Sequence, residues 1–155
     1  MKRQFINLGS TTSKDFIKDP KRLAITLSRY KFVGKMFDGF EKVLEVGAGD
    51  GFKSISLKNN FKNFTITDIS SRKKIFFEKN YKFKNIRYKC HNFIKKPMNE
   101  KFNGIFALDV LEHIDKKNEK KFILNIKKSL KKNGSIIIGM PSLESQKYAS
   151  ALAKK

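Results

Sequence analysis

The segment Val43–Gly51 carries the residues of this chain that are best suited to bind a small ligand. It is an apolar stretch that ends in glycines at alternate positions, and it contains two acids, Glu45 and Asp50. Glycine has no Cβ, so it adopts positive φ angles and lets a ligand lie close to the backbone. A strand that turns in this way into a helix forms a nucleotide-type pocket at its carboxyl end. The acids favour a cationic ligand over a pyrophosphate, which prefers the bare N–H groups of a helix N-terminus. A tight turn without any ligand is the alternative.

A further acid, Asp68, lies 21 residues beyond Gly47, near the end of the apolar stretch Phe64–Ile69. An acid about 20 residues after such a turn can accept hydrogen bonds from the hydroxyls of a ribose. Asp68 could instead cap the helix that follows, although Ser70 or Ser71 could serve there. We therefore predict that a ribose lies against this carboxylate.

Strands and helices that alternate along the chain position these residues. After a loose polar lead over residues 1–12, an amphipathic helix of roughly 18 residues begins at Asp19-Pro20 and ends at Asp38-Gly39. Helices are then expected at Phe52–Asn59, Ser71–Asn80 and Lys117–Lys131, and strands at Lys42–Val46, Phe64–Ile69, Ile86–Cys90, Phe102–Asp109 and Ser135–Met140. Asn133-Gly134 is expected to stop the last helix.

This alternation predicts the α/β class: a Rossmann-like, doubly wound, mainly parallel sheet in a three-layer αβα sandwich. The run Ile136–Ile138 is typical of a strand that is buried on both faces. Ligands of such sheets bind beyond the carboxyl ends of the strands. The functional residues are therefore expected at the strand ends.

Two of these strand ends resemble motifs of one family. Val43–Gly51 is similar to motif I of the class I S-adenosylmethionine-dependent methyltransferases, which typically reads V-L-E-V-G-x-G-x-G, and Leu108–Ile114 resembles the L-E-H-I segment after strand four of many small-molecule members. The resemblance covers roughly residues 20–142. It implies that the cofactor is S-adenosyl-L-methionine, whose ammonium and sulfonium groups fit the acids of the motif.

The resemblance also implies roles for individual residues. Asp68 would bind the adenosine ribose, Asn92 would accept a hydrogen bond from the adenine amino group, and Arg29 would pair with the methionine carboxylate. His113 would act as a general base or order its loop. The expected cofactor-binding residues are Arg29, Tyr30, Glu45, Gly47, Ala48, Gly49, Asp50, Gly51, Asp68, Ile69, Asn92, Phe93, Leu108, Asp109, Val110 and His113, and the candidate catalytic residue is His113.

Metal and nucleic-acid readings of the sequence are less favoured. Asp109-x-x-Glu112-His113 resembles a magnesium site of some O-methyltransferases, but the three side chains need not converge, and we expect no metal. The net charge of +21 suits nucleic acid. However, nearly all of the basic residues are lysines spread along the chain, which favours a solvated basic surface, and the Asp/Asn-Pro-Pro-aromatic tetrad of nucleic-acid amino-methylating enzymes is absent after strand four.

The chain is expected to form a single methyltransferase-like domain over residues 1–155. Residues 1–40 would form the lead and a lid helix, 41–142 the cofactor-binding core, and 143–155 the start of a truncated C-terminal part. The family normally adds a sixth and a seventh strand, but the sequence stops soon after the fifth, so we expect both to be missing. Three explanations stay open: a fragment, a natural short form, or a sheet edge that is covered by an oligomer or partner chain. The lone Cys90, the absence of a secretory signal and the lack of an apolar run long enough to span a membrane indicate a cytoplasmic protein.

The sequence therefore predicts an enzyme that transfers a methyl group from S-adenosylmethionine to an oxygen or nitrogen of a small molecule, sugar or lipid head group. A non-catalytic or partner-dependent binding module and an RNA methyltransferase are the alternatives. A nucleotide-dependent oxidoreductase is disfavoured because Phe52 stands where the dinucleotide fingerprint has its third glycine.

Overall fold

The computed structural model describes residues 5–142, 144 and 147, and its centre is a five-stranded parallel sheet. The strands are β1 (Lys42–Val46), β2 (Asn63–Asp68), β3 (Ile86–Cys90), β4 (Phe102–Leu108) and β5 (Leu130–Gly139). Their order across the sheet is β3-β2-β1-β4-β5, and all neighbouring pairs are parallel. The chain order reverses between β1 and β4, which is the place where open α/β sheets bind ligands.

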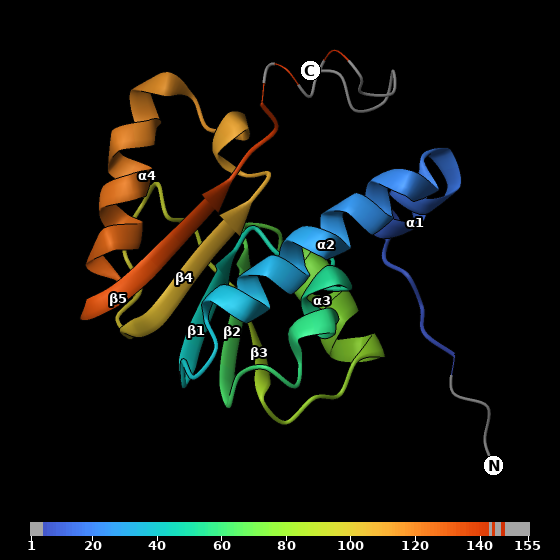
Figure 1. Cartoon of the computed structure of the whole chain (residues 1–155), viewed down its shortest axis with the longest axis horizontal. Helices are drawn as coiled ribbons and strands as arrows, with labels where there is room; N and C mark the ends of the chain where they lie inside the picture. Colours follow the sequence, from blue (N-terminus) through green and yellow to red (C-terminus); the bar gives the residue numbers. More distant parts are fainter. Residues whose placement is uncertain (1–4, 143, 145–146, 148–155) are drawn as a thin grey trace.

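Helices cover both faces of this sheet (Figure 1). They are α1 (Ser10–Lys18), α2 (Pro20–Met36), α3 (Ser71–Asn80) and α4 (Lys116–Lys128), with short 3-10 helices η1 (Lys53–Leu57) and η2 (Leu111–His113). Consecutive residues of β1, Val43 and Leu44, belong to different core clusters, one shared with α2, η1 and α3 and the other with α4. The predicted three-layer sandwich, without a sixth or seventh strand among the described residues, is confirmed.

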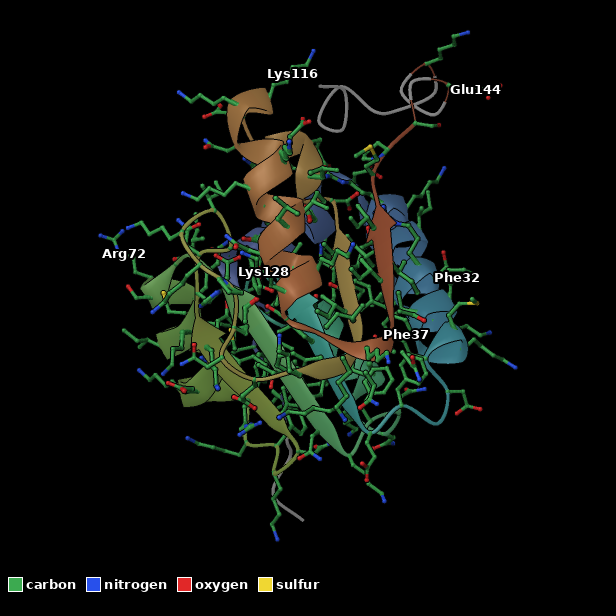
Figure 2. All side chains as sticks on the ribbon, turned by 90° about the vertical axis from the view of Figure 1, so that its left-hand side faces the viewer. Phe32, Phe37, Arg72, Lys116, Lys128 and Glu144 are labelled. Carbon is green, nitrogen blue, oxygen red and sulfur yellow. The ribbon has the colours of Figure 1, made fainter. Side chains whose placement is uncertain are left out.

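Buried aromatic side chains fix α2 on the sheet. Phe37, Phe64 and Phe106 expose 1% or less of their surface, and the ring centroids of Phe64 and Phe106 are 6.0 Å apart. Gly104 makes room for them, because a Cβ at this position would lie 2.7 Å from the Phe37 ring. Figure 2 shows Phe37 beside the sheet and Phe32 on the outer side of α2, where it is 56% exposed.

The basic side chains lie mainly on the outside of the molecule. Arg72 and Lys116 extend away from it in Figure 2, as expected for a solvated surface. No helix in the described part of the chain is long and apolar enough to cross a membrane.

The beginning of the chain differs from the sequence prediction. Residues 1–12 were expected to be a loose lead, but α1 already begins at Ser10. The carboxylate of Asp50 holds its first turn by accepting hydrogen bonds from the backbone N–H and the hydroxyl of Thr12, both at 2.8 Å. Thr12 is fully buried. The partner of this turn lies 38 residues further along the chain, so a local pattern could not reveal it.

The predicted stop of the last helix at Asn133-Gly134 is also wrong. α4 ends before Ser129, and Gly134 lies inside β5 without a positive φ. The buried Ser129 hydroxyl donates to the carbonyl oxygen of Asn125 at 2.8 Å and accepts from the backbone N–H of Met98 at 2.9 Å. These tertiary hydrogen bonds end the helix earlier than the local signal does.

Two further elements depart from their predictions. The helix expected at Phe52–Asn59 is the shorter 3-10 helix η1, and Ile136–Ile138 is not buried on both faces. Ile138 is 36% exposed because β5 is an edge strand of the described sheet. The other strands and α3 lie within one residue of the predicted bounds.

Candidate functional site

A cleft of about 940 Å³ lies at the carboxyl ends of β1, β2, β3 and β4. Its size falls at the upper end of the roughly 300–1,000 Å³ that is typical of small-molecule sites. α1 and α2 border it on one side, and the loops that follow β3 and β4 border it on the other. The cleft therefore lies where the sequence predicted a site, across the reversal of strand order.

The three glycines after β1 all have positive φ angles, but they serve different purposes. A Cβ at Gly47 would lie 2.3 Å from Val110, and one at Gly51 would lie 2.4 Å from the Phe77 ring. These two glycines allow close packing within the protein. A Cβ at Gly49 would meet no protein atom within 4 Å, and Gly49 lines the cleft. The space beside Gly49 is therefore open to a ligand.

Asp68 presents a nearly buried carboxylate to the cleft at the end of β2. Its Oδ2 accepts from the backbone N–H of Gly49 at 3.1 Å and from Lys73 at 3.3 Å, and its Oδ1 accepts from the N–H of Ser70 at 3.0 Å. The next residue, Ile69, also lines the cleft and is 72% exposed. A fixed carboxylate accepts hydrogen bonds, and an exposed aliphatic side chain packs against apolar surface. Together they suit a ligand that has hydroxyl groups next to an apolar face.

The end of β3 supplies Asn92 and Phe93. The side-chain oxygen of Asn92 accepts from the backbone N–H of Ile94 at 2.8 Å, so the oxygen predicted to bind adenine already stabilises its own turn. Phe93 is 2% exposed and makes an edge contact with His91, with ring centroids 4.5 Å apart. Burial lowers the pKa of His91, and its Nε2 lies 2.9 Å from the carbonyl oxygen of Lys96.

The two acids of the glycine segment both have partners inside the protein. Asp50 holds the first turn of α1, although it also lines the cleft. Glu45 is 1% exposed, and its Oε1 accepts a hydrogen bond from the Tyr30 hydroxyl at 2.5 Å. Burial raises the pKa of Glu45 to about 7. Asp50 thus reaches the cleft whereas Glu45 does not, and a contact of either carboxylate with a cationic ligand stays a prediction.

Glu45→Gln is expected to make stability less dependent on pH. Below pH 4.5 the carboxyl group is protonated in both the folded and the unfolded chain; above it, the unfolded chain loses its proton first, so stability falls until the pH passes about 7. Glutamine cannot ionise, so the variant should gain on the order of 3 kcal/mol relative to the parent between pH 5 and 8, at roughly 1.4 kcal/mol per pKa unit. Thermal unfolding across this range measures the gain. The exposed Glu41→Gln is the control, and parallel curves for Glu45→Gln and the parent would contradict the assignment.

Arg29 and Asp109 form a two-pronged ion pair between α2 and the end of β4. The two terminal nitrogens of Arg29 donate to the two oxygens of Asp109 at 2.7 and 2.5 Å. Burial alone would raise the pKa of Asp109, but the Arg29 guanidinium lowers it below its ordinary value. Arg29 was predicted to bind a cofactor carboxylate. In the structure Arg29 does not line the cleft, and both terminal nitrogens of its guanidinium bind Asp109.

The loop after β4 brings Leu108, Asp109, Val110 and His113 to the cleft. His113 ends η2 and is exposed, and it lines the cleft. Among the residues that the structure describes, no three His, Cys, Asp or Glu side chains are grouped to hold a metal ion. The structure thus brings together all of the predicted cofactor-binding residues except Arg29, Glu45 and Gly51, which do not line the cleft.

Sequence reasoning missed the polar wall contributed by α1, α2 and η1. Asp15 lies between two cations, with Arg22 at 3.8 Å and Lys53 at 3.9 Å, and all three line the cleft. The other residues missed are Ser10, Thr11, Lys14, Thr26, Val46, Thr67, Lys73, His91, Ile94, Ile114 and Phe122. No local pattern marked this wall, because α1 reaches the cleft through the contact of Thr12 with Asp50, 38 residues further along the chain.

Comparison with known proteins agrees with this architecture. A family described as "Methyltransferase domain" matches residues 44–138. The N-methyltransferase NodS of Bradyrhizobium japonicum WM9 is a similar solved structure, at 17% identity and a TM-score of 0.70, with 84% of this chain and 74% of that one covered. DhpI in its SAM–HEP complex aligns at 13% identity and a TM-score of 0.70, with 91% and 66% covered.

A methyltransferase of Clostridium acetobutylicum ATCC 824 that depends on S-adenosylmethionine aligns at 25% identity and a TM-score of 0.60, with 73% of this chain and 47% of that one covered. The chain thus spans between about half and three quarters of the length of these structures. No curated protein matches the sequence.

Proposed function

The chain belongs to the methyltransferase domain family, of the class I fold that uses S-adenosylmethionine, and from this premise we propose that it methylates a nitrogen of a small molecule. The proposal also includes an oxygen as the acceptor atom, and a sugar or a lipid head group as the molecule that carries it. Nitrogen is favoured because the solved structure of NodS is that of an N-methyltransferase. The observation that carries the proposal is the open space at Gly49 beside the fixed carboxylate of Asp68.

The residues of the cleft fit the parts of this cofactor. Asp68 would accept hydrogen bonds from the ribose hydroxyls, and the exposed Ile69 and the buried Phe93 would flank the adenine. The backbone at Leu108 would face the methionine amino group. Cofactor binding would cover the isoleucine side chain and contribute hydrophobic stabilisation.

The cofactor's carboxylate needs a cation other than Arg29. We assign it to Arg22 and Lys53, which lie on either side of Asp15 at distances longer than a hydrogen bond. The side chains of Arg22 and Lys53 could therefore turn from Asp15 to the carboxylate of a bound ligand. With this assignment, the amino-acid part of the cofactor would lie against α2 and η1, and its adenosine part against Asp68.

When bound, S-adenosylmethionine supplies a methyl group that is activated by its sulfonium. The chain's own contribution is mainly to hold the acceptor in line with that group, which can account for most of the rate enhancement. Apolar side chains of the cleft wall, among them Ile94, Ile114 and Phe122, would exclude water from it. His113 at the opening would remove the proton that the acceptor gives up.

Calorimetric titration of the purified chain with S-adenosylmethionine, S-adenosylhomocysteine and NAD tests the proposal. Binding of the first two in the micromolar range, without binding of NAD, is expected. Release of S-adenosylhomocysteine would then be followed against a panel of amines and alcohols. A chain that binds none of the three would instead favour a module that needs a partner, for example along the exposed edge of β5.

His113→Gln is expected to lower kcat by about tenfold without changing the affinity for S-adenosylmethionine. The effect should be smaller than the 10²–10⁴-fold of an indispensable base, because a neutral amine can give up its proton after the methyl group has been transferred. Turnover with an acceptor found in the panel measures kcat, and calorimetry measures the affinity. An unchanged kcat would exclude His113 as the base, and an equal loss of affinity would make it a cofactor-binding residue.

A further inference from the structure

The Arg29–Asp109 ion pair acts on a strained point of the backbone. Asp109 has φ +57°, and it is the only residue other than glycine with a positive φ in the described part of the chain. Aspartate tolerates this left-handed region better than most residues, but it still occupies it at a conformational cost. A strained residue at the rim of a ligand cleft has to be held there by its surroundings.

Two contacts hold Asp109. Its backbone N–H donates to the carbonyl oxygen of Gly139 on β5 at 2.8 Å, which fixes the point where the chain leaves the sheet. Its carboxylate is held by both ends of the Arg29 guanidinium. The remaining donor, Nε of Arg29, is buried without an acceptor among the described residues. Among the described residues, the hydrogen bonds of the Arg29 guanidinium therefore all go to Asp109.

The conformation of Asp109 determines where the next residue lies. Val110 packs against Gly47 so closely that a Cβ on that glycine would be 2.3 Å from Val110 Cγ2. This contact joins the turn after β1 to the loop after β4, and Gly47, Asp109 and Val110 all line the cleft. If Asp109 relaxed to a negative φ, Val110 would leave Gly47, and the spacing between the two walls would change.

We propose that Arg29 is a positioning residue, which holds Asp109 in its left-handed conformation and thereby sets the distance between the glycine turn and the end of β4. The inference rests on the proposed function. By that proposal, the methionine amino group would face the backbone at Leu108, at the end of β4, whereas the adenosine part would lie against Asp68 and Ile69; all three residues line the cleft. Arg29 acts on the first part only, without touching the cofactor.

Binding of two ligands to Arg29→Met separates this role from a general structural one. S-adenosylmethionine should bind about tenfold more weakly to the variant, whereas 5′-methylthioadenosine, which lacks the amino-acid part, should bind within twofold of the parent. Arg87→Met is the matched control, because Arg87 also pairs with a carboxylate, that of Glu100, but lies outside the cleft. It should change neither affinity. Equal weakening of both ligands by Arg29→Met would overturn the proposal, as would no change in either.

Substitutions at Asp109 test the role of the backbone. Glycine adopts positive φ freely, so Arg29→Met combined with Asp109→Gly should recover the affinity for S-adenosylmethionine to within about threefold of the parent. Arg29→Met combined with Asp109→Ala removes the same charges but keeps the strain, and it should not recover. Failure of the glycine variant to recover would refute the proposal, whereas a parent chain that binds neither ligand would refute the proposed function itself.

Discussion

Gly49→Val is expected to abolish the binding of S-adenosylmethionine while leaving the protein folded. The new side chain would meet no protein atom near its Cβ and would project into the cleft, where the cofactor has to lie. The backbone strain at φ +63° should lower stability by about 1–2 kcal/mol. Calorimetry with S-adenosylmethionine measures the binding, and circular dichroism verifies that the variant is folded.

Gly39→Val provides the matched control for this experiment. Gly39 has φ +77°, a Cβ there would also meet no atom within 4 Å, and the residue lies outside the cleft. Both valine variants should therefore lose similar amounts of stability, but only Gly49→Val should lose the ligand. Substitutions at Gly47 or Gly51 cannot serve, because their side chains would collide with Val110 and Phe77. If Gly49→Val bound S-adenosylmethionine normally, the cofactor could not lie beside this turn.

The fold and the main line of the cleft could be predicted because their signals are local. Apolar runs mark the strands, and the rule that ligands bind beyond the carboxyl ends of parallel strands brings Gly49, Asp68, Phe93 and Asp109 together without any knowledge of side-chain contacts. The structure places all four in the lining of one cleft. Asp68 and Asp109 lie within one residue of the end of a predicted strand, and Gly49 and Phe93 lie three residues beyond such an end.

The roles of the charged residues could not be predicted, because their partners are far away in the sequence. Asp50 looked like a ligand for a cation, but it holds Thr12, 38 residues before it. Arg29 looked like a ligand for a carboxylate, but it holds Asp109, 80 residues after it. A sequence shows which residues carry charge, whereas packing decides which of them are already neutralised before a ligand arrives. Arg22 and Lys53, to which we assign the carboxylate of the cofactor, lie on either side of Asp15 only because α1, α2 and η1 pack together.

Asp68→Ala is expected to weaken S-adenosylmethionine binding by about a hundredfold or more. A hydrogen bond to a charged group contributes about 1.5–3 kcal/mol, and the two ribose hydroxyls would lose two such bonds to the carboxylate. Asp68→Asn keeps one acceptor oxygen and the shape of the side chain, so it should lose about tenfold. Both affinities are measured by calorimetric titration.

The ribose itself supplies the control that separates recognition from structure, since Asp68 also accepts from the N–H groups of Gly49 and Ser70. The parent should bind adenosine much more tightly than 2′,3′-dideoxyadenosine, whereas Asp68→Ala should bind the two about equally. A variant that had only lost the shape of the turn would weaken both nucleosides and preserve their ratio. Equal binding of the two nucleosides by the parent would show that no carboxylate of this cleft accepts hydrogen bonds from the ribose hydroxyls. The assignment of the ribose to Asp68 would then be wrong.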